Sequence, residues 1–117
     1  MAVPFDQRAD LIWFDGKLVP TSDSKVSVLT HGLHYASCVF EGERAYGGTV
    51  FKSTAHSERL KNSARILDFE IPYSVAEIDA AKQLVIDRNQ LPDAYLRPIA
   101  WRGSEMMGVA AQTNTIH

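Results

Sequence analysis

The sequence predicts an α+β fold, in which an antiparallel sheet carries two helices packed on one side. Three observations lead to this prediction. Asp15-Gly16 and Gly47-Gly48 each lie between short apolar or alternating runs, which favours two hairpins. Two segments with helical spacing follow the second hairpin, and a strand-like segment follows them. Strands on either side of two consecutive helices are typical of an antiparallel sheet with one covered face.

The first half of the chain is predicted to be mostly extended. Short apolar runs on both sides of Asp15-Gly16 form the arms of the first hairpin. The alternating run that begins at Cys38 forms the next strand, and its partner follows Gly47-Gly48. The expected strands span residues 11–14, 18–19, 26–29, 38–46 and 49–52, with one helical turn at 31–35.

The second half is predicted to contain both helices. Ser53 or Thr54 caps the first helix, which runs to about Asp68. Ser74 opens the second helix, because Glu77 stands three places on and completes a capping box. The apolar positions expected to be buried are Leu60, Ala64 and Leu67 on the first helix and Ile78, Ala81, Leu84 and Val85 on the second. Further strands are expected at 94–101 and, just beginning, at 115–117.

The composition is that of an ordinary soluble domain. The chain has 117 residues, of which 45% are hydrophobic and 22% charged, enough for one hydrophobic core. A net charge of −2 argues against a nucleic-acid groove or a site for anionic membranes. Cys38 is the only cysteine, which fits a reducing compartment. With no signal-like start and no run of transmembrane length, the expected location is cytoplasmic.

One face of the central strand carries an unusual set of side chains. Successive side chains of a strand point to opposite faces, so Phe40, Gly42 and Arg44 share a side. The last clear strand places Tyr95 and Arg97 on one side in the same way. The planar guanidinium of arginine suits a carboxylate or a phosphate, and a glycine lets a ligand approach the backbone. This face is predicted to be the wall of a pocket for a small anion with an apolar part.

Plainer interpretations of the same residues remain open. Arg44 could pair at the surface with a nearby carboxylate, and Arg97 could lie on an exposed edge. Arg59 could be a rim arginine whose stem covers the core. The carboxylates that could pair with Arg44 are Glu41, Glu43 and Glu58.

Two other kinds of site find little support in the sequence. Tyr35 lies near His31 and His34, but no further cysteine or histidine stands at ligand spacing, so no metal site is expected. Lysines occur only at turn, strand-end or outer helix positions, so none is expected to be a desolvated amine suited to Schiff-base chemistry. These lysines are Lys17, Lys25, Lys52, Lys61 and Lys82.

Three stretches together resemble the branched-chain amino-acid aminotransferases, which are pyridoxal-phosphate enzymes of fold type IV. They are SVLTHGLHYASCVFEGERAYGG, FKSTAHSERLKNSARIL and AYLRPIAWRG, with MGV after them. The resemblance runs in order from about Asp10 to the last residue. The combination of HY…VFEGxRAY, HxxRL and Y-x-R-P is specific, although each element alone is weak.

The resemblance implies roles for particular residues. The arginine of HxxRL, here Arg59, would hold the cofactor phosphate. Phe40 and Gly42 would line the slot for the aliphatic side chain, and Arg44 would border it. The remaining implied roles are contacts with substrate carboxylates for Tyr95 and Arg97, and contributions to the site of a neighbouring subunit for Tyr35, Met107 and Val109.

The same resemblance implies a reaction and a domain organisation. Branched-chain L-amino acids would pass their amino group to 2-oxoglutarate, in a homodimer or a higher homo-oligomer. Residues 1–117 would be an N-terminal small domain that ends before its last strands. The lysine-bearing large domain would lie outside the chain, so the chain alone is expected to be inactive.

Two alternatives and one departure accompany this hypothesis. Another fold type IV enzyme, such as a D-amino-acid aminotransferase or an aminodeoxychorismate lyase, is the first alternative. A free-standing module that binds small carboxylates is the second. Glu43 stands where the family often has an apolar residue, and it is expected to point away from the pocket.

Overall fold

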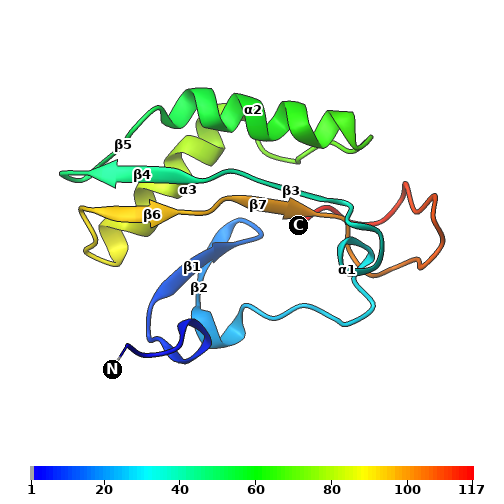
Figure 1. Cartoon of the computed structure of the whole chain (residues 1–117), viewed down its shortest axis with the longest axis horizontal. Coiled ribbons are helices and arrows are strands. Elements are labelled where there is room, and N and C mark those ends of the chain that lie inside the picture. Colours follow the sequence, from blue (N-terminus) through cyan, green and yellow to red (C-terminus); the bar gives the residue numbers. More distant parts are fainter. Residues whose placement is uncertain (1) are drawn as a thin grey trace.

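The computed structural model describes residues 2–117 and confirms the predicted α+β architecture. Antiparallel strands form the sheet, and the helices α2 (Ser53–Ile66) and α3 (Val75–Arg88) lie together along it (Figure 1). A separate hairpin of β1 (Leu11–Phe14) and β2 (Lys17–Pro20) lies below β7 in the same view, whereas α2 lies above the sheet. Asp15-Gly16 forms the turn of this hairpin, as predicted.

The long predicted strands are each interrupted once. The first consists of β3 (Cys38–Phe40) and β4 (Glu43–Tyr46), and β5 (Thr49–Val50) returns beside β4. The last consists of β6 (Ala94–Leu96), which pairs with β4, and β7 (Ile99–Trp101), which pairs with β3. Between the two ladders the N–H of Glu41 donates to the carbonyl oxygen of Pro98 over 3.0 Å, so the strands stay aligned. Proline has no N–H for a ladder, which explains the break on its strand.

The core lies between the sheet and the two helices. Val39 and Ala100 from the strands pack against Leu60 and Ala64 of α2 and Ile78 of α3. A second cluster joins the other end of the sheet to α3 and consists of Ala45, Val50, Ile86 and Leu96. Because these strand residues all point to the helices, the side chains between them point to the opposite face.

Both capping predictions can be compared with the structure, and one of them is wrong. The capping box of α3 is confirmed, with Ser74 and Glu77 each bonding the other's backbone N–H. The first helix has no side-chain cap: Lys52 precedes it with a left-handed φ of 56°. Ser53 and Thr54 are its first residues instead, and their hydroxyls donate to a carboxylate of α3.

Several details of the other predictions differ from the structure. Residues 26–29 form a loop rather than a strand, whereas the predicted helical turn is α1 (His31–Tyr35). Leu67 and Leu84 are exposed, because α2 ends before Leu67 and α3 turns a different face to the core. Ile116 forms only a single bridge to the sheet. Two short 3-10 helices, η1 (Phe5–Gln7) and η2 (Thr21–Asp23), flank the first hairpin.

Candidate functional site

The face of the sheet opposite the helices carries the predicted set of side chains. We call Phe40, Gly42, Arg44, Tyr95 and Arg97 the arginine face. All five are exposed, whereas the residues that alternate with them are at least partly buried. Strand pairing places Arg44 directly opposite Tyr95. The alternation read from the sequence therefore holds on both strands, despite the interruption in each.

Arg97 is the best-defined member of the arginine face. Its Cζ atom lies 3.9 Å from the centre of the Phe40 ring, which is a stacked cation–π arrangement. Its Nη1 atom makes a long contact of 3.5 Å with the Tyr95 hydroxyl. A planar guanidinium above an aromatic ring keeps its edge free for a carboxylate. The arrangement thus combines an apolar surface with a fixed positive charge.

The surface ion pairs considered for these arginines are not formed. Among residues 2–117, no carboxylate lies within 4 Å of the guanidinium of Arg44 or Arg97. Glu41 and Glu43 point to the helices instead and are buried, as was expected for Glu43. Arg44 lies 5.7 Å from the ring of Tyr46. Both arginines are therefore free to meet an anionic ligand.

Gly42 lies beside the Tyr95 side chain on the arginine face. A Cβ atom at this position would lie 2.9 Å from the hydroxyl oxygen of Tyr95. This distance is shorter than a side-chain carbon tolerates, so the tyrosine ring would have to move. The glycine is thus needed for the position of the Tyr95 hydroxyl.

A Gly42→Ala variant is expected to displace Tyr95 while the fold survives. The φ angle of Gly42 is not in the left-handed region, so alanine fits the backbone, and the change in stability should stay within about 1 kcal/mol. Binding of carboxylate ligands to the arginine face should weaken, because Tyr95 leaves its place. Urea unfolding and ligand titration measure the two effects. Gly48→Ala, whose Cβ meets nothing within 4 Å but whose φ of 83° is left-handed, should instead lower the stability without weakening ligand binding.

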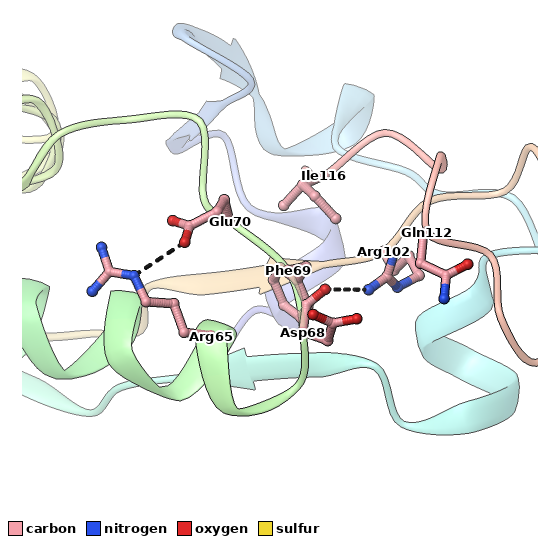
Figure 2. A pocket seen from close by; sticks show the side chains of 7 residues that line it. All are labelled: Arg65, Asp68, Phe69, Glu70, Arg102, Gln112 and Ile116. Atoms are coloured by element: carbon pink, nitrogen blue, oxygen red, sulfur yellow. Dashed lines mark hydrogen bonds and ion pairs between the residues drawn. The ribbon is translucent and has the colours of Figure 1, made fainter.

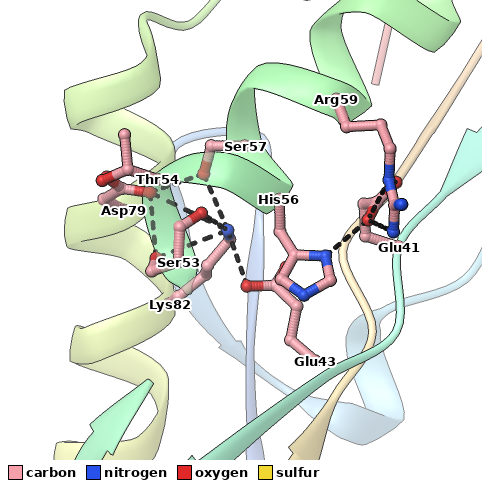
Figure 3. Close-up of polar contacts among 9 residues, drawn as sticks. All are labelled: Glu41, Glu43, Ser53, Thr54, His56, Ser57, Arg59, Asp79 and Lys82. Carbon is pink, nitrogen blue, oxygen red and sulfur yellow. Dashed lines mark hydrogen bonds and ion pairs between the residues drawn. The ribbon is translucent and has the colours of Figure 1, made fainter. Parts of the chain in front are cut away.

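Arg59 belongs to a separate group on the helix side of the strand. Its Nε and Nη2 atoms donate to the Glu41 carboxylate over 2.7–3.0 Å. His56, one turn earlier on α2, places Nδ1 2.6 Å from the same carboxylate (Figure 3). The Arg59 side chain is 67% exposed, whereas that of Glu41 is only 5% exposed. Arg59 is therefore an exposed cation held by a buried carboxylate.

The charges in this group stabilise one another. The Arg59 hydrogen bond, with help from His56, lowers the pKa of Glu41 although burial opposes this. The Glu41 hydrogen bond raises the pKa of Arg59 above its already high value. Both groups stay charged over the whole neutral range.

A second polar group, which was not predicted from the sequence, connects the sheet to both helices. Lys82 of α3 places Nζ 2.8 Å from Oε1 of Glu43, and both side chains are almost fully buried (Figure 3). Lys82 was predicted at an outer helix position, and this prediction is wrong because its side chain is buried. Its amine also donates to Ser57 over 2.7 Å, and Ser57 donates to Asp79 over 2.5 Å. This group lies on the helix side of the sheet, not on the arginine face.

Burial acts differently on the two carboxylates of the second group. Desolvation raises the pKa of Glu43, although Lys82 partly offsets it. Burial also opposes ionisation of Asp79, but hydrogen bonds from Ser57, Thr54 and Ser53 together lower its pKa. Burial thus disfavours the charged form of Glu43, and Lys82 is the group that favours it.

The residues assigned to a neighbouring subunit's site lie together at one end of the molecule. The Tyr35 hydroxyl donates to the carbonyl oxygen of Met107 over 2.9 Å. His31 stacks near Tyr35 with ring centres 4.4 Å apart and has Nε2 2.9 Å from the carbonyl oxygen of Gly108. Val109 is 79% exposed. These contacts join α1 to the loop after β7, away from the β4 and β6 ends that carry Arg44 and Tyr95 (Figure 1).

A cavity of about 320 Å³ lies elsewhere, beyond the end of α2 (Figure 2). Its two arginines are already paired: Arg65 with Glu70 over 3.2 Å, and Arg102 with the backbone oxygens of Asp68 and Ala111. A charged ligand would have to displace these partners. The cavity is therefore a poorer candidate than the arginine face.

The described part of the chain offers neither a metal site nor a membrane-spanning helix. Residues 2–117 contain no group of three or more His, Cys, Asp or Glu side chains placed to hold a metal ion. Within the same residues, no helix has the length and apolar character needed to cross a membrane.

The comparisons with known proteins agree with the motifs. Residues 38–117 match the family model described as amino-transferase class IV. The probable branched-chain-amino-acid aminotransferase of Rickettsia bellii is 51% identical over 98 residues, which cover 84% of this chain and 34% of that protein. The branched-chain-amino-acid aminotransferase of Pseudomonas aeruginosa is 45% identical over 114 residues, covering 94% and 37%.

A solved structure gives the same result for the fold. The branched-chain amino acid aminotransferase of Escherichia coli superposes with a TM-score of 0.86 and 40% identity, covering 93% of this chain and 38% of that one. A second solved branched-chain amino acid aminotransferase, 42% identical with a TM-score of 0.87, covers 92% and 38%. This second enzyme was solved with N-(5'-phosphopyridoxyl)-L-glutamate and with 4-methylvaleric acid, and we call it the ligand-bound relative.

The matches extend over only part of each relative. This chain spans about a third of the length of the proteins that it matches. The family model, in contrast, covers more than half of the residues of this chain. The chain therefore belongs to the class IV amino-transferases.

Proposed function

We propose that this chain forms one wall of the active site of a branched-chain amino-acid aminotransferase. In this reaction the amino group of L-leucine, L-isoleucine or L-valine passes to 2-oxoglutarate, with pyridoxal phosphate as cofactor. The observation that carries the proposal is the arginine face, where Arg97 Cζ lies 3.9 Å from the centre of the Phe40 ring and has no carboxylate partner among residues 2–117. The ligands of the ligand-bound relative support it, because one contains glutamate and the other is a branched apolar carboxylic acid.

The arginine face suits both substrates in turn. A branched aliphatic side chain needs an apolar surface, which Phe40 and the open backbone at Gly42 provide. Glutamate and 2-oxoglutarate carry a second carboxylate, which a guanidinium can bind through two parallel hydrogen bonds. Arg97 and the Tyr95 hydroxyl serve this carboxylate in our proposal, and Arg44 borders the same surface. One site thereby accepts an apolar and an anionic side chain.

The residues around Arg59 fit the phosphate of the cofactor. A guanidinium has five N–H donors, and Glu41 occupies one on Nε and one on Nη2, so the other three have no partner among residues 2–117. Because the side chain is also 67% exposed, an anion can reach these donors. When bound, pyridoxal phosphate supplies the electron sink that allows the bonds at Cα to be broken. Arg59 would anchor it without taking part in the chemistry.

We infer that the 117-residue chain is inactive by itself. Family members use a lysine amine, but no lysine belongs to β3, β4, β6 or β7, and Lys82 is buried on the helix side. Mixing the chain with pyridoxal phosphate, L-isoleucine and 2-oxoglutarate should give no glutamate and no saturable absorbance change of the cofactor. Stoichiometric absorbance change together with turnover would contradict this inference.

The other features of the proposal follow from the family resemblance. Tyr35, Met107 and Val109 reach a neighbouring subunit's site in a homodimer or a larger homo-oligomer, which agrees with their exposure beyond α1. We place the protein in the cytoplasm, since a lone cysteine fits a reducing compartment. In the proposed organisation, this chain is the small domain beside a larger domain that bears the lysine.

Turnover by the purified protein that carries this chain tests the proposed reaction. With pyridoxal phosphate and 2-oxoglutarate present, L-isoleucine should yield glutamate at a rate far above that with D-alanine. A preference for D-alanine would instead assign the protein to a D-amino-acid aminotransferase. Absence of any amino transfer, with saturable binding of 2-oxoglutarate, would favour a carboxylate-binding module.

A further inference from the structure

Arg59 is unusual because an exposed arginine is held in one position. A free arginine side chain loses much of its rotamer entropy when it is fixed by a ligand. Here the two oxygens of Glu41 accept from Nε over 2.9 and 3.0 Å, and Oε1 also accepts from Nη2 over 2.7 Å. Part of the entropy loss is therefore incurred on folding, before any ligand binds.

Glu41 is in turn held by the fold. Glu41 directly follows β3, at the point where the strand is interrupted, and its side chain is only 5% exposed. Its backbone N–H is bound to the Pro98 carbonyl oxygen, so main chain and side chain are both fixed. An ionised carboxylate accepts only, so the His56 Nδ1 atom at 2.6 Å carries the proton in this contact. His56 thus holds the Glu41 carboxylate in place, and Glu41 in turn holds the Arg59 guanidinium.

We propose that Glu41 is a positioning residue that orients the guanidinium of Arg59 toward a phosphate monoester, and that His56 fixes Glu41. The inference rests on the proposed function, in which Arg59 holds the cofactor phosphate. Glu41 does not touch the phosphate. It occupies the inner edge of the guanidinium, so that the free N–H groups, both on Nη1 and one on Nη2, are left for the ligand.

A carboxylate near an anion site also has the opposite effect, because like charges repel. Solvent screens this repulsion, because the Arg59 side chain is 67% exposed. The direct bonds from Arg59 and His56 also offset the charge of Glu41. The positioning effect acts through direct hydrogen bonds of 2.7–3.0 Å and is not screened in this way. We therefore expect loss of the Glu41 charge to weaken phosphate binding.

The test uses the apoprotein that carries this chain, with equilibrium dialysis against pyridoxal phosphate and, separately, against pyridoxal. Arg59→Ala should raise the Kd for pyridoxal phosphate about a hundred-fold, and Glu41→Gln about ten-fold, since charge-assisted hydrogen bonds are lost. Neither should change the Kd for pyridoxal, which has no phosphate. This readout does not depend on catalytic turnover.

Two controls separate positioning from general electrostatics and from folding. Glu58→Gln removes an exposed carboxylate next to Arg59 in the sequence. If charge repulsion were the only effect, Glu58→Gln and Glu41→Gln would both bind pyridoxal phosphate more tightly than the parent. His56→Ala should weaken binding, and His56→Asn, whose amide can donate from the Nδ1 position, should restore much of it. A merely structural role would not show this rescue, and unfolding midpoints confirm that each variant is folded.

The outcomes distinguish the role of Arg59 from that of Glu41. If Arg59→Ala leaves the Kd for pyridoxal phosphate unchanged, the assignment of Arg59 in the proposed function is wrong, and this inference falls with it. If Arg59→Ala weakens binding but Glu41→Gln leaves it unchanged or tightens it, only the positioning role is wrong. Equal weakening for pyridoxal and its phosphate would also overturn that role.

Discussion

A Lys82→Met variant is expected to lose about 3–5 kcal/mol of unfolding free energy at neutral pH, because it leaves a buried carboxylate without its cation. The Glu43 side chain is fully buried, and Lys82 Nζ lies 2.8 Å from its Oε1 atom. Methionine fills the space of the lysine stem but has no charge. Equilibrium unfolding in urea at pH 7.5 measures the loss.

The stability lost in Lys82→Met should be smaller at low pH, and the direction of this pH dependence follows from the pKa of Glu43. Desolvation raises the pKa of Glu43 in the folded state, so folding favours the protonated form. Stability from such a group is fully present below the unfolded pKa, about 4.3, and is lost as pH rises through the folded value. Lys82→Met should therefore differ least from the parent near pH 4 and most above pH 7.

Two further variants show whether the ion pair is the cause. Glu43→Leu combined with Lys82→Met should recover most of the loss, because replacing both partners of a buried pair is often close to neutral. Lys25→Met, at an exposed loop position, should change the unfolding free energy by less than about 0.5 kcal/mol. A Lys82→Met variant as stable as the parent at pH 7.5 would show that the buried pair contributes little.

The second large effect concerns the substrate. Arg97→Ala is expected to lower kcat/KM for glutamate and 2-oxoglutarate about 100- to 1000-fold, as loss of a preorganised donor to a charged group commonly does. The value for L-isoleucine should fall less than about ten-fold, because its side chain has no second carboxylate. Steady-state kinetics of both half-reactions in the protein that carries this chain measure the difference.

Matched variants make the Arg97 result specific. Arg97→Lys keeps the charge but not the planar fork above Phe40, so an intermediate loss is expected. Arg88→Ala, at the exposed end of α3, removes a positive charge elsewhere and should leave both values unchanged. An equal fall for isoleucine and glutamate after Arg97→Ala would mean that Arg97 serves a group common to both substrates.

The sequence predicted what depends on local periodicity. Alternation along one strand placed Phe40, Gly42 and Arg44 on one face, because the period of two follows from strand geometry alone. The Asp15-Gly16 hairpin and the Ser74 capping box were equally local, and both are confirmed. The strand interruptions could be predicted only in part. Pro98 indicates a break in its own strand, but the sequence does not show that the paired strand is interrupted as well.

The pairs on the helix side could not be predicted in the same way. Glu41 meets Arg59, and Glu43 meets Lys82, only because α2 and α3 pack on that face of the sheet. Spacing within one strand or one helix contains no information about such contacts. The only available signal was that both glutamates alternate with the arginine face and therefore had to point to the helices. The same contacts explain the wrong cap, since Ser53 bonds Asp79 rather than its own helix.

We expect the arginine face to bind carboxylates beside an apolar surface. A crystal structure of the protein that carries this chain, with 2-oxoglutarate bound, tests it most directly. We predict that a ligand carboxylate accepts hydrogen bonds from Arg97 and the Tyr95 hydroxyl, on the same face as Phe40. A ligand bound elsewhere, with Arg44 and Arg97 still surrounded only by water, would contradict the claim.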